Sequence, residues 1–438
     1  MDNYPRILVF TVAAWNSKVG SNTWATLLEH YPRENVANIC IREEKPDSNV
    51  CSRYFIVSEN RVLKSILNRK IKTGYEVRIS KEDANSDDLK AHNKRYNEMR
   101  KKRRYSMLLA REFVWKIGKW KSRELDTFLD SFKPDVILHS MEGYIHLNRI
   151  IMYAIKRTGA KAVGYIWDDN FTYKQSDDFG YKVYRYFQRH SLLKLAKYTK
   201  GFFSITNMTK KEADDFFGIN SVVLTKPLSS VPEIGEYTIT YPIRMLYTGK
   251  LTIGRDRTIE VFNRALKEIN RDRVRILVDI YTPTVLLREV EEKITDSHFC
   301  VIHPPIPQED ALQKQKEADV LLFVEDIDGK DSRIARLSFS TKITDYLSSG
   351  KCIFAIGNRN TAPMNYFMEN DAAIVAYDFN SIISALQKIV DNPAVVREYA
   401  KKAMGCGIKN HDSEEIHRTF DNMIKKVVEG KNEDTLDC

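Results

Sequence analysis

Residues Leu337–Gly357 read LSFSTKITDYLSSGKCIFAIG and combine a short helical segment with a strand. Hydroxyl side chains and Lys342 precede Ile343–Ser348, which we expect to be helical, and Gly350 follows it as a glycine typically follows a helix. Cys352–Ile356 is then an apolar run of strand length. A helix that leads directly into a buried strand is the repeating unit of an α/β protein.

The same alternation of apolar runs and helical segments continues on both sides of this stretch. The runs lack the polar–apolar alternation of a half-exposed strand, so they indicate strands buried on both faces of a parallel sheet. The other expected strands are Arg6–Ala14, Arg53–Val57, Val136–His139, Lys161–Trp167, Gly201–Thr206, Ser221–Leu224, Arg244–Tyr247, Arg273–Ile280, Phe299–Ile302 and Val320–Val324.

The chain has 438 residues, which is enough for two domains. Residues 227–242 contain three prolines and no helical period, so we interpret them as a linker. We therefore expect two Rossmann-like α/β domains, at 1–226 and 243–410, that face each other across a cleft. Residues 411–438 are expected to form a C-terminal helix that packs back on the first domain. Open α/β sheets bind ligands beyond the carboxyl ends of their strands, which predicts a ligand site in the cleft.

Positive charge is concentrated in one region of the chain. The net charge is +10, and the region 61–123 alone carries 20 basic and 7 acidic residues. Its densest part is Arg100–Arg104, and aromatic residues follow at Tyr105, Phe113, Trp115 and Trp120. One interpretation is a solvated helix face with inward aromatics. The other is an anionic membrane surface as the partner, which we favour over nucleic acid because the charge is local and no recognised nucleic-acid module accompanies it.

Other features of the sequence bear on its compartment. Six scattered cysteines without a C-x-x-C pair favour reduced thiols and argue against a zinc site. The N-terminus does not resemble a signal peptide, and no apolar run approaches the ~18 residues of a membrane helix. We expect a cytoplasmic protein that lies peripherally on the inner face of the cell membrane.

Two segments of the second domain have the composition of an anion site. Ser340, Thr341 and Lys342 stand before the expected helix, where free N–H groups suit a phosphate, and Asp345 lies one turn further for ribose hydroxyls. The same residues also fit an ordinary helix cap. In the second segment, Leu246–Asp256, a glycine follows a strand directly and two cations follow the glycine. These residues are Gly249, Lys250 and Arg255.

The order of these motifs resembles the donor domain of group 1 bacterial glycosyltransferases with the GT-B fold. The resemblance includes the Ser340–Lys351 motif, which is similar to the family pattern S-x-K-x-x-E-Y-L-x-x-G-K, and the segment 318–323 (ADVLLF). In the first domain, 133–139 (KPDVILH) and the glycine loop at 18–21 (KVGS) agree with the family. The match covers most of the chain except the basic region.

The resemblance implies a role for each matching residue. Lys250 and Arg255 would hold the diphosphate of a UDP- or GDP-sugar, which is a co-substrate and not a cofactor. Asp345, in place of the usual Glu, would hold the ribose, and Gly20 would let the first loop approach the phosphates. Two cations at the leaving nucleoside diphosphate would make a metal unnecessary.

The chain departs from the family pattern at two places. The first Glu of the E-x7-E motif of retaining members is replaced by Leu337, and the His-Asp pair after the fifth strand is replaced by Trp167-Asp168-Asp169. Asp168 is the first catalytic candidate, as a base or a sugar contact, although an aspartate pair after a strand also fits a helix cap. His139 at another strand end is the second candidate, and Glu142 is a weaker one.

The leading hypothesis is therefore a glycosyltransferase. It would move a hexose from a nucleotide sugar to a lipid-linked or polysaccharide acceptor at the cytoplasmic membrane face, in surface-polysaccharide synthesis. A sugar-nucleotide epimerase on the same fold is the enzymatic alternative. A member that binds nucleotide sugar or membrane without turnover is the non-enzymatic one, and the absent Glu supports it.

Overall fold

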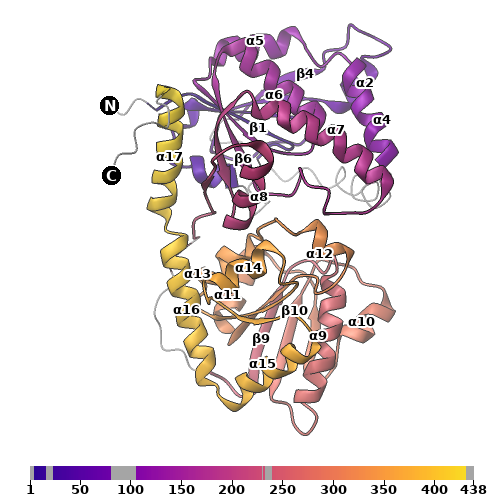
Figure 1. Ribbon diagram of the computed structural model, residues 1–438, viewed down its shortest axis with the longest axis vertical. Coiled ribbons are helices and arrows are strands. Elements are labelled where there is room, and N and C mark those ends of the chain that lie inside the picture. Colours follow the sequence, from indigo (N-terminus) through magenta and orange to yellow (C-terminus); the bar gives the residue numbers. More distant parts are fainter. Residues whose placement is uncertain (1–3, 16–22, 80–104, 229, 232–238, 431–438) are drawn as a thin grey trace. The chain divides into compact units, whose positions relative to one another are not determined.

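The computed structural model describes residues 4–15, 23–79, 105–228, 230–231 and 239–430 (Figure 1). The chain divides into two compact units. Unit 1 is Met1–Leu224 together with His417–Cys438, and unit 2 is Thr225–Ile416. Each unit is an α/β structure built on a mainly parallel sheet, which confirms the fold class predicted from the apolar runs.

Unit 1 contains an eight-stranded sheet in the order β4-β3-β2-β1-β5-β6-β7-β8. All neighbouring strands are parallel except β4, which pairs antiparallel with β3. In chain order, β2, β3 and β4 lie on one side of β1, and β5 to β8 then follow on its other side. The strands are β1 Ile7–Thr11, β2 Val36–Cys40, β3 Arg53–Val57, β4 Gly74–Arg78, β5 Val136–Ser140, β6 Lys161–Ile166, β7 Thr199–Ser204 and β8 Val222–Val223.

Several helices of unit 1 begin after a residue whose side chain caps them. Ser122, Asp178 and Thr206 each accept a hydrogen bond from a backbone N–H three residues ahead, which satisfies a donor of the first turn. These caps start α5, α7 and α8. The helices are α1 Thr23–Leu28, α2 Glu59–Lys64, α4 Tyr105–Ile117, α5 Arg123–Phe132, α6 Ile145–Thr158, α7 Phe179–Ala196 and α8 Asn207–Phe217.

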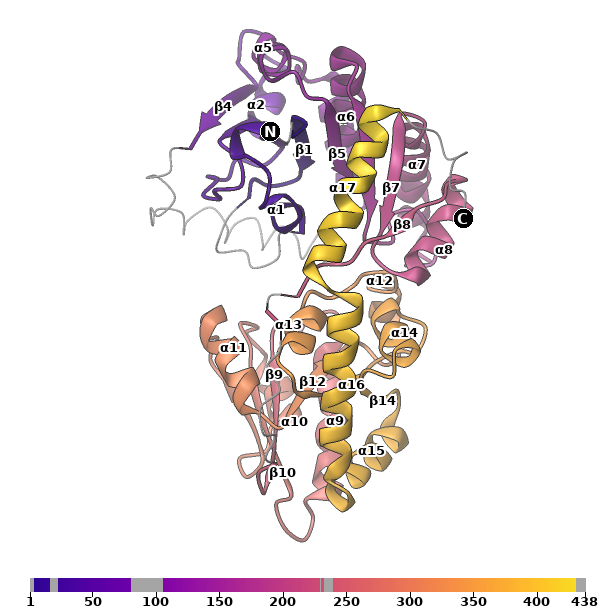
Figure 2. The ribbon, with the colours of Figure 1, turned by 90° about the vertical axis from the view of Figure 1, so that its left-hand side faces the viewer.

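The last helix of the chain, α17 (Ser413–Glu429), contributes to the core of unit 1 from His417 onward. Figure 2 shows it beside β7, where a Cβ on Gly201 would lie 2.6 Å from the sulfur of Met423. Phe420 is fully buried, and its ring lies 5.9 Å from Phe203 and 6.5 Å from Trp24. An aromatic ring enclosed on several sides anchors the helix through its buried area.

Unit 2 contains a six-stranded parallel sheet in the order β11-β10-β9-β12-β13-β14. Its strands carry apolar residues on both faces: in β12, Val320 and Leu322 join one hydrophobic core, and Leu321 and Phe323 join the core on the other face. The strands are β9 Ile243–Thr248, β10 Ile276–Tyr281, β11 Cys300–His303, β12 Val320–Val324, β13 Cys352–Ile356 and β14 Ile374–Ala376. The helices are α9 Arg255–Ile269, α10 Arg288–Ile294, α11 Gln308–Glu317, α12 Lys330–Ile334, α13 Lys342–Ser348, α14 Ala362–Glu369, α15 Phe379–Asp391 and α16 Ala394–Asn410.

Phe420→Ala should destabilise unit 1 by about 3–5 kcal/mol, because it removes a buried ring and leaves a cavity. All five tryptophans of the chain lie before residue 168, so tryptophan fluorescence during urea denaturation reports on unit 1. Phe113→Ala is the matched control, since that side chain is exposed and its loss should change stability little. A loss below about 1 kcal/mol for Phe420→Ala would show that α17 does not anchor unit 1.

Candidate active site

Both sheets have a point at which the strand order reverses, between β1 and β5 in unit 1 and between β9 and β12 in unit 2. At such a point the loops beyond the carboxyl ends of the two strands turn away from each other. Ligands of open α/β sheets bind in the space that results. Seven of the residues expected to form the site follow the two switch-point strands of unit 2, namely Gly249, Lys250 and Arg255 after β9, and Ser340, Thr341, Lys342 and Asp345 after β12.

In unit 2, Gly249 directly follows β9, and its lack of a side chain leaves space for the side chain of Lys342. Its φ is +140°, a conformation that side chains other than glycine rarely adopt, and a Cβ there would lie 2.1 Å from the Lys342 Nζ. That ammonium donates a hydrogen bond to the Tyr247 Oη (3.2 Å) and lies 4.3 Å from the centre of its ring. The loop after β9 thus receives the first side chain of α13.

The environment of Lys342 disfavours its charge. Burial is the main reason that the pKa of Lys342 falls to about 7, and the neighbouring Arg255 cation lowers it further. The carboxylates of Glu325 and Asp345 act in the opposite direction. An anion bound at this place would favour the protonated ammonium, so Lys342 is suited to binding negative charge.

Arg255, the first residue of α9, is held by an acidic partner. Its guanidinium donates to both carboxylate oxygens of Glu325 (2.8 and 2.9 Å) and to the Val324 carbonyl (3.0 Å). The predicted phosphate ligand is therefore fixed in orientation, and part of its charge is balanced. The sequence prediction did not include Glu325. The feature of the sequence that could have identified Glu325 is its position immediately after β12, at the switch point.

The remaining predicted donor residues lie around this centre. Lys250 is exposed, and its carbonyl accepts a hydrogen bond from the Tyr247 Oη (2.9 Å). Asp345 lies in the first turn of α13, and burial raises its pKa while the cations of Lys226 and Lys342 act against the rise. Ser340 and Thr341 form the turn before α13, where their carbonyls accept bonds from Ile343 N and Thr344 Oγ1.

In unit 1, His139 does not lie in a loop. β5 continues to Ser140, and the fully buried imidazole has its Nε2 3.1 Å from the Thr199 Oγ1. Burial lowers the pKa of His139 to about 4, which makes the ring neutral. A ring with no exposed surface cannot contact a substrate, so we exclude His139 from the catalytic candidates. Gly20 lies outside the described residues.

Asp168 lies two residues beyond β6 and is partly exposed. Asp169 is buried and accepts hydrogen bonds from the backbone N–H (2.9 Å) and hydroxyl (2.5 Å) of Thr172. It does not cap a helix, because the next helix is α7, which is capped by Asp178. Asp168 acts electrostatically on Glu142, which follows β5. Two carboxylates thus stand at neighbouring strand ends of unit 1.

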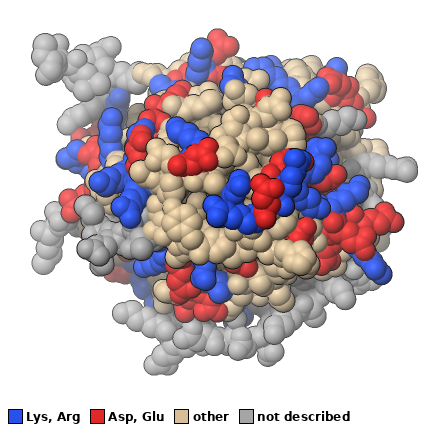
Figure 3. Space-filling model, turned by 90° about the horizontal axis from the view of Figure 1, so that it is seen from below, with Lys and Arg blue, Asp and Glu red and all other residues tan. Residues whose placement is uncertain are grey.

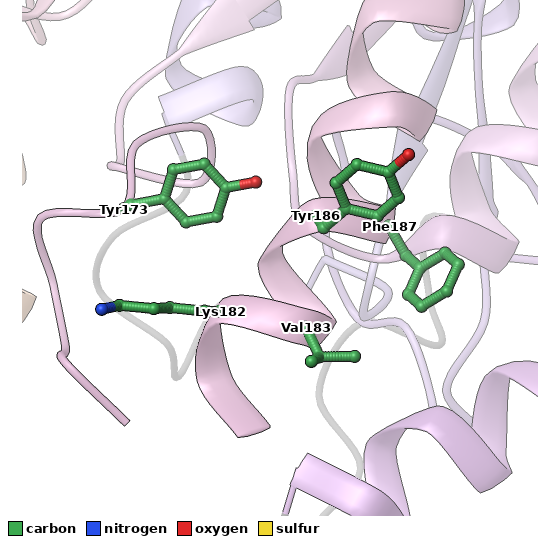
Figure 4. A pocket seen from close by; sticks show the side chains of 5 residues that line it. All are labelled: Tyr173, Lys182, Val183, Tyr186 and Phe187. Carbon is green, nitrogen blue, oxygen red and sulfur yellow. The ribbon is translucent and has the colours of Figure 1, made fainter. Parts of the chain in front are cut away.

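A second feature of unit 1 is an apolar pocket of about 560 Å³ on α7. Tyr173 comes from the preceding loop, and the other lining residues come from the helix (Figure 4). Phe179, at the start of α7, is 80% exposed, and Met107 and Phe113 are exposed on α4, which packs beside α7. The residues of this pocket, which we call the α7 pocket, are Tyr173, Lys182, Val183, Tyr186 and Phe187.

Comparison with solved structures supports the fold. The chain is similar to trehalose 6-phosphate synthase from Burkholderia multivorans (10% identity, 97% of each chain, TM-score 0.58). It is also similar to Anabaena HepE in complex with UDP (8% identity, 96% of this chain and 100% of that chain, TM-score 0.61). A third is a mutant of Staphylococcus aureus TarM (10% identity, 96% of this chain and 99% of that chain, TM-score 0.56). These likenesses show that the chain has the GT-B fold expected from its sequence.

No protein-family model matches the chain, and no curated protein matches it.

Binding of UDP at pH 8 should take up close to one proton, because the bound diphosphate restores the charge of Lys342, which is mostly neutral at that pH. Calorimetry in two buffers of different ionisation enthalpy measures this uptake. Lys342→Met should abolish the uptake and weaken binding tenfold or more, since a charged hydrogen bond contributes about 1.5–3 kcal/mol.

Lys250→Met is the matched control, because it removes an exposed cation of the same loop. It should weaken UDP binding and leave the proton uptake unchanged. An unchanged uptake in Lys342→Met would mean that another group binds the proton.

Proposed function

We propose that this chain, which has the GT-B fold, is a glycosyltransferase that moves a hexose from a UDP- or GDP-linked donor to an acceptor. The observation that carries the proposal is the insertion of the Lys342 ammonium into the space above Gly249, beside Arg255. Similar structures are described with UDP and glucose bound or as UDP-forming synthases. Their bound nucleotide supports a nucleoside diphosphate as the ligand of this cluster.

Each residue of the cluster would act on one part of the donor. Lys250, Arg255 and Lys342 would balance the charge of the diphosphate, and this charge grows on the leaving group as the glycosidic bond breaks. Asp345 would accept hydrogen bonds from the ribose hydroxyls, with Ser340 and Thr341 in the adjoining turn. Three cations offset the diphosphate without a metal, so we propose that transfer is metal-independent.

The acceptor is proposed to be lipid-linked, or a polysaccharide, at an anionic membrane surface in surface-polysaccharide synthesis. Support comes from the α7 pocket, which is lined by aromatic side chains and Lys182, and from the exposed apolar residues on α4 and α7. Apolar side chains next to basic ones suit the boundary between lipid chains and acidic head groups. On the molecular face in Figure 3, by contrast, basic and acidic residues are interspersed.

The location that we propose is the inner face of the cell membrane. No helix in the described ranges is long and apolar enough to cross a membrane. Attachment would therefore rest on surface contacts. The densest basic segment, Arg100–Arg104, lies outside the described residues.

A panel of UDP-, GDP- and dTDP-sugars tests the proposed reaction. Wild-type protein should release nucleoside diphosphate from one donor by hydrolysis or transfer, and Lys342→Met should slow the release at least tenfold through weaker charge stabilisation. Recovery of an epimerised donor would instead establish the epimerase alternative. Binding without product would establish the non-catalytic one, for which the fully buried Leu337 at the position of the family's Glu is the supporting observation.

Sedimentation with lipid vesicles tests the membrane surface. The protein should pellet with phosphatidylglycerol vesicles and not with phosphatidylcholine vesicles, and salt should release it, because exposed charges are screened beyond about 8–10 Å. The double variant Phe179→Ser and Phe187→Ser should lose most of the pelleting, as should replacement of Arg100–Arg104 by Gln.

Leu287→Ser, which changes an exposed apolar residue in unit 2, is the matched control and should pellet like wild type. Equal pelleting with both kinds of vesicle would assign attachment to the aromatic residues alone. Absence of pelleting would contradict the membrane surface.

A further inference from the structure

Two chain segments near the ends of unit 2 lie side by side, although they are far apart in the sequence. The Thr225 hydroxyl donates a hydrogen bond to the Asn410 carbonyl (3.2 Å), and the Leu228 N–H donates to the His411 carbonyl (3.0 Å). The His411 Nδ1 lies 2.8 Å from the Lys226 carbonyl. These hydrogen bonds join residues 225–228 to residues 410–411, and we call the two segments the paired ends of unit 2.

The imidazole of His411 is fully buried, and both of its nitrogens have partners. The Lys226 carbonyl can only accept a hydrogen bond, so Nδ1 must carry the proton. Burial lowers the pKa of His411 to about 4, so the ring is neutral near pH 7 and its Nε2 is an acceptor. The Tyr366 hydroxyl therefore donates to Nε2 (2.8 Å). The ring is thus fixed by α14 on one side and by the other paired end on the opposite side.

Phe339 connects this imidazole to the turn before α13. Its ring lies nearly parallel to that of His411 (6.2 Å between centres, 20° between planes) and meets the ring of Tyr366 edge-on (5.1 Å, 79°). Phe339 is followed directly by Ser340 and Thr341, which form the turn, and by Lys342. A side chain at the entrance of the turn is therefore held by groups that also hold the paired ends.

Two further contacts join the paired ends to α13. Burial raises the pKa of Asp345, and the Lys226 cation opposes this rise. α16 also packs along α13 (Figure 2), where a Cβ on Gly407 would lie 3.2 Å from the Leu347 Cβ and 3.4 Å from the Leu228 Cδ2. Closely packed groups of this kind cannot shift independently of one another.

We propose that Phe339, Tyr366 and His411 are positioning residues of the donor site and that they couple the turn before α13 to the paired ends of unit 2. The inference rests on the proposed function, in which this turn binds a nucleoside diphosphate. Phe339 sets the position of the turn, and the other two residues hold Phe339. A ligand that orders the turn then also orders the paired ends, and loosening the paired ends weakens binding of the ligand by the same factor.

Hydrogen exchange of the wild-type protein tests this coupling without any substitution. The amides of Leu228 and His411 are bonded to the carbonyls of His411 and Gly407, so their exchange reports on opening of the paired ends. Saturating UDP should slow this exchange about fivefold or more, the lower end of the usual coupling between two sites. Unchanged exchange with UDP bound would overturn the proposal. Absence of UDP binding would instead contradict the proposed function.

Phe339→Ala separates this coupling from a general stabilisation of unit 2 by its ligand. The substitution removes the ring and leaves the hydrogen bonds between the paired ends in place. UDP should then bind about fivefold or more weakly, and at saturation it should no longer slow exchange at Leu228 and His411. Phe339→Tyr keeps the ring and should restore both effects. Slowed exchange that persists in Phe339→Ala would mean that UDP stabilises the unit as a whole, and this result would overturn the proposal.

Met368→Ala is the matched control. Met368 lies on α14, the helix that carries Tyr366, but its side chain is 40% exposed. UDP affinity and the slowing of exchange should both equal those of the wild type. A loss as large as that of Phe339→Ala would assign the effect to α14 in general and would overturn the role of Phe339.

A double-variant cycle tests whether His411 acts through Phe339. The side chain of His411→Asn can still donate to the Lys226 carbonyl, but it lacks the ring that lies against Phe339. This variant should also bind UDP about fivefold or more weakly. The double variant with Phe339→Ala should bind UDP about as weakly as Phe339→Ala alone, because both changes break one link. Losses that multiply would show that the two residues act independently and would overturn the proposal.

Discussion

The absence of a side chain at Gly249 gives Lys342 its place, and the proposed donor site depends on this contact. The ammonium lies so close to Gly249 that a Cβ there would be 2.1 Å from it, and it packs against the ring of Tyr247. It is thereby removed from water and placed near a second cation, Arg255, whose charge Glu325 partly balances. Two cations can be kept close together in the ligand-free state because one is paired and the other readily loses its proton.

The residues at the two switch points carry charges that are mainly of opposite sign. In unit 2, Lys250, Arg255 and Lys342 concentrate positive charge beyond β9 and β12. In unit 1, Glu142 and Asp168 bring two carboxylates beyond β5 and β6, with Arg42 as a counter-charge. A leaving diphosphate would need the first arrangement.

The sequence predicts the parallel sheets well because buried strands need apolar residues on both faces. β12 shows this, since its alternate residues enter different cores and the run VLLFV is uninterrupted. β2 was not predicted because Asn38 interrupts its apolar pattern. Its buried amide is hydrogen-bonded to the Val9 carbonyl and the Thr11 hydroxyl of β1, and only the tertiary structure shows these partners. The edge strand β4 was also missed, because its side chains are at most partly buried.

The candidate residues that cluster in sequence could be selected from local patterns, whereas contacts between residues far apart in the chain could not be predicted. Gly249, Lys250, Arg255 and Lys342 stand beside strand or helix ends, and a local pattern identifies them. The pairing of Arg255 with Glu325, 70 residues further along the chain, has no local signal. The sequence predicted that the strand ends at His139, because the apolar run ends there. β5 continues by one residue to Ser140, whose hydroxyl donates a hydrogen bond to Glu142.

Lys342 and Glu142 both titrate near pH 7, and burial is the main cause for each. The lowered lysine pKa destabilises the folded state progressively as the pH falls from 10.5 to about 7, because the unfolded chain gains this proton first. The raised glutamate pKa destabilises it progressively as the pH rises from 4.5 to about 7, because the unfolded chain loses that proton first. At neutral pH each of the two shifted pKa values therefore lowers the free energy of unfolding by most of its full effect. The lowered pKa also leaves Lys342 ready to gain a proton when an anion binds beside it. Replacing either residue by a neutral one of similar size should therefore stabilise the fold near neutral pH, because the unfavourable shift in pKa is removed with the titrating group.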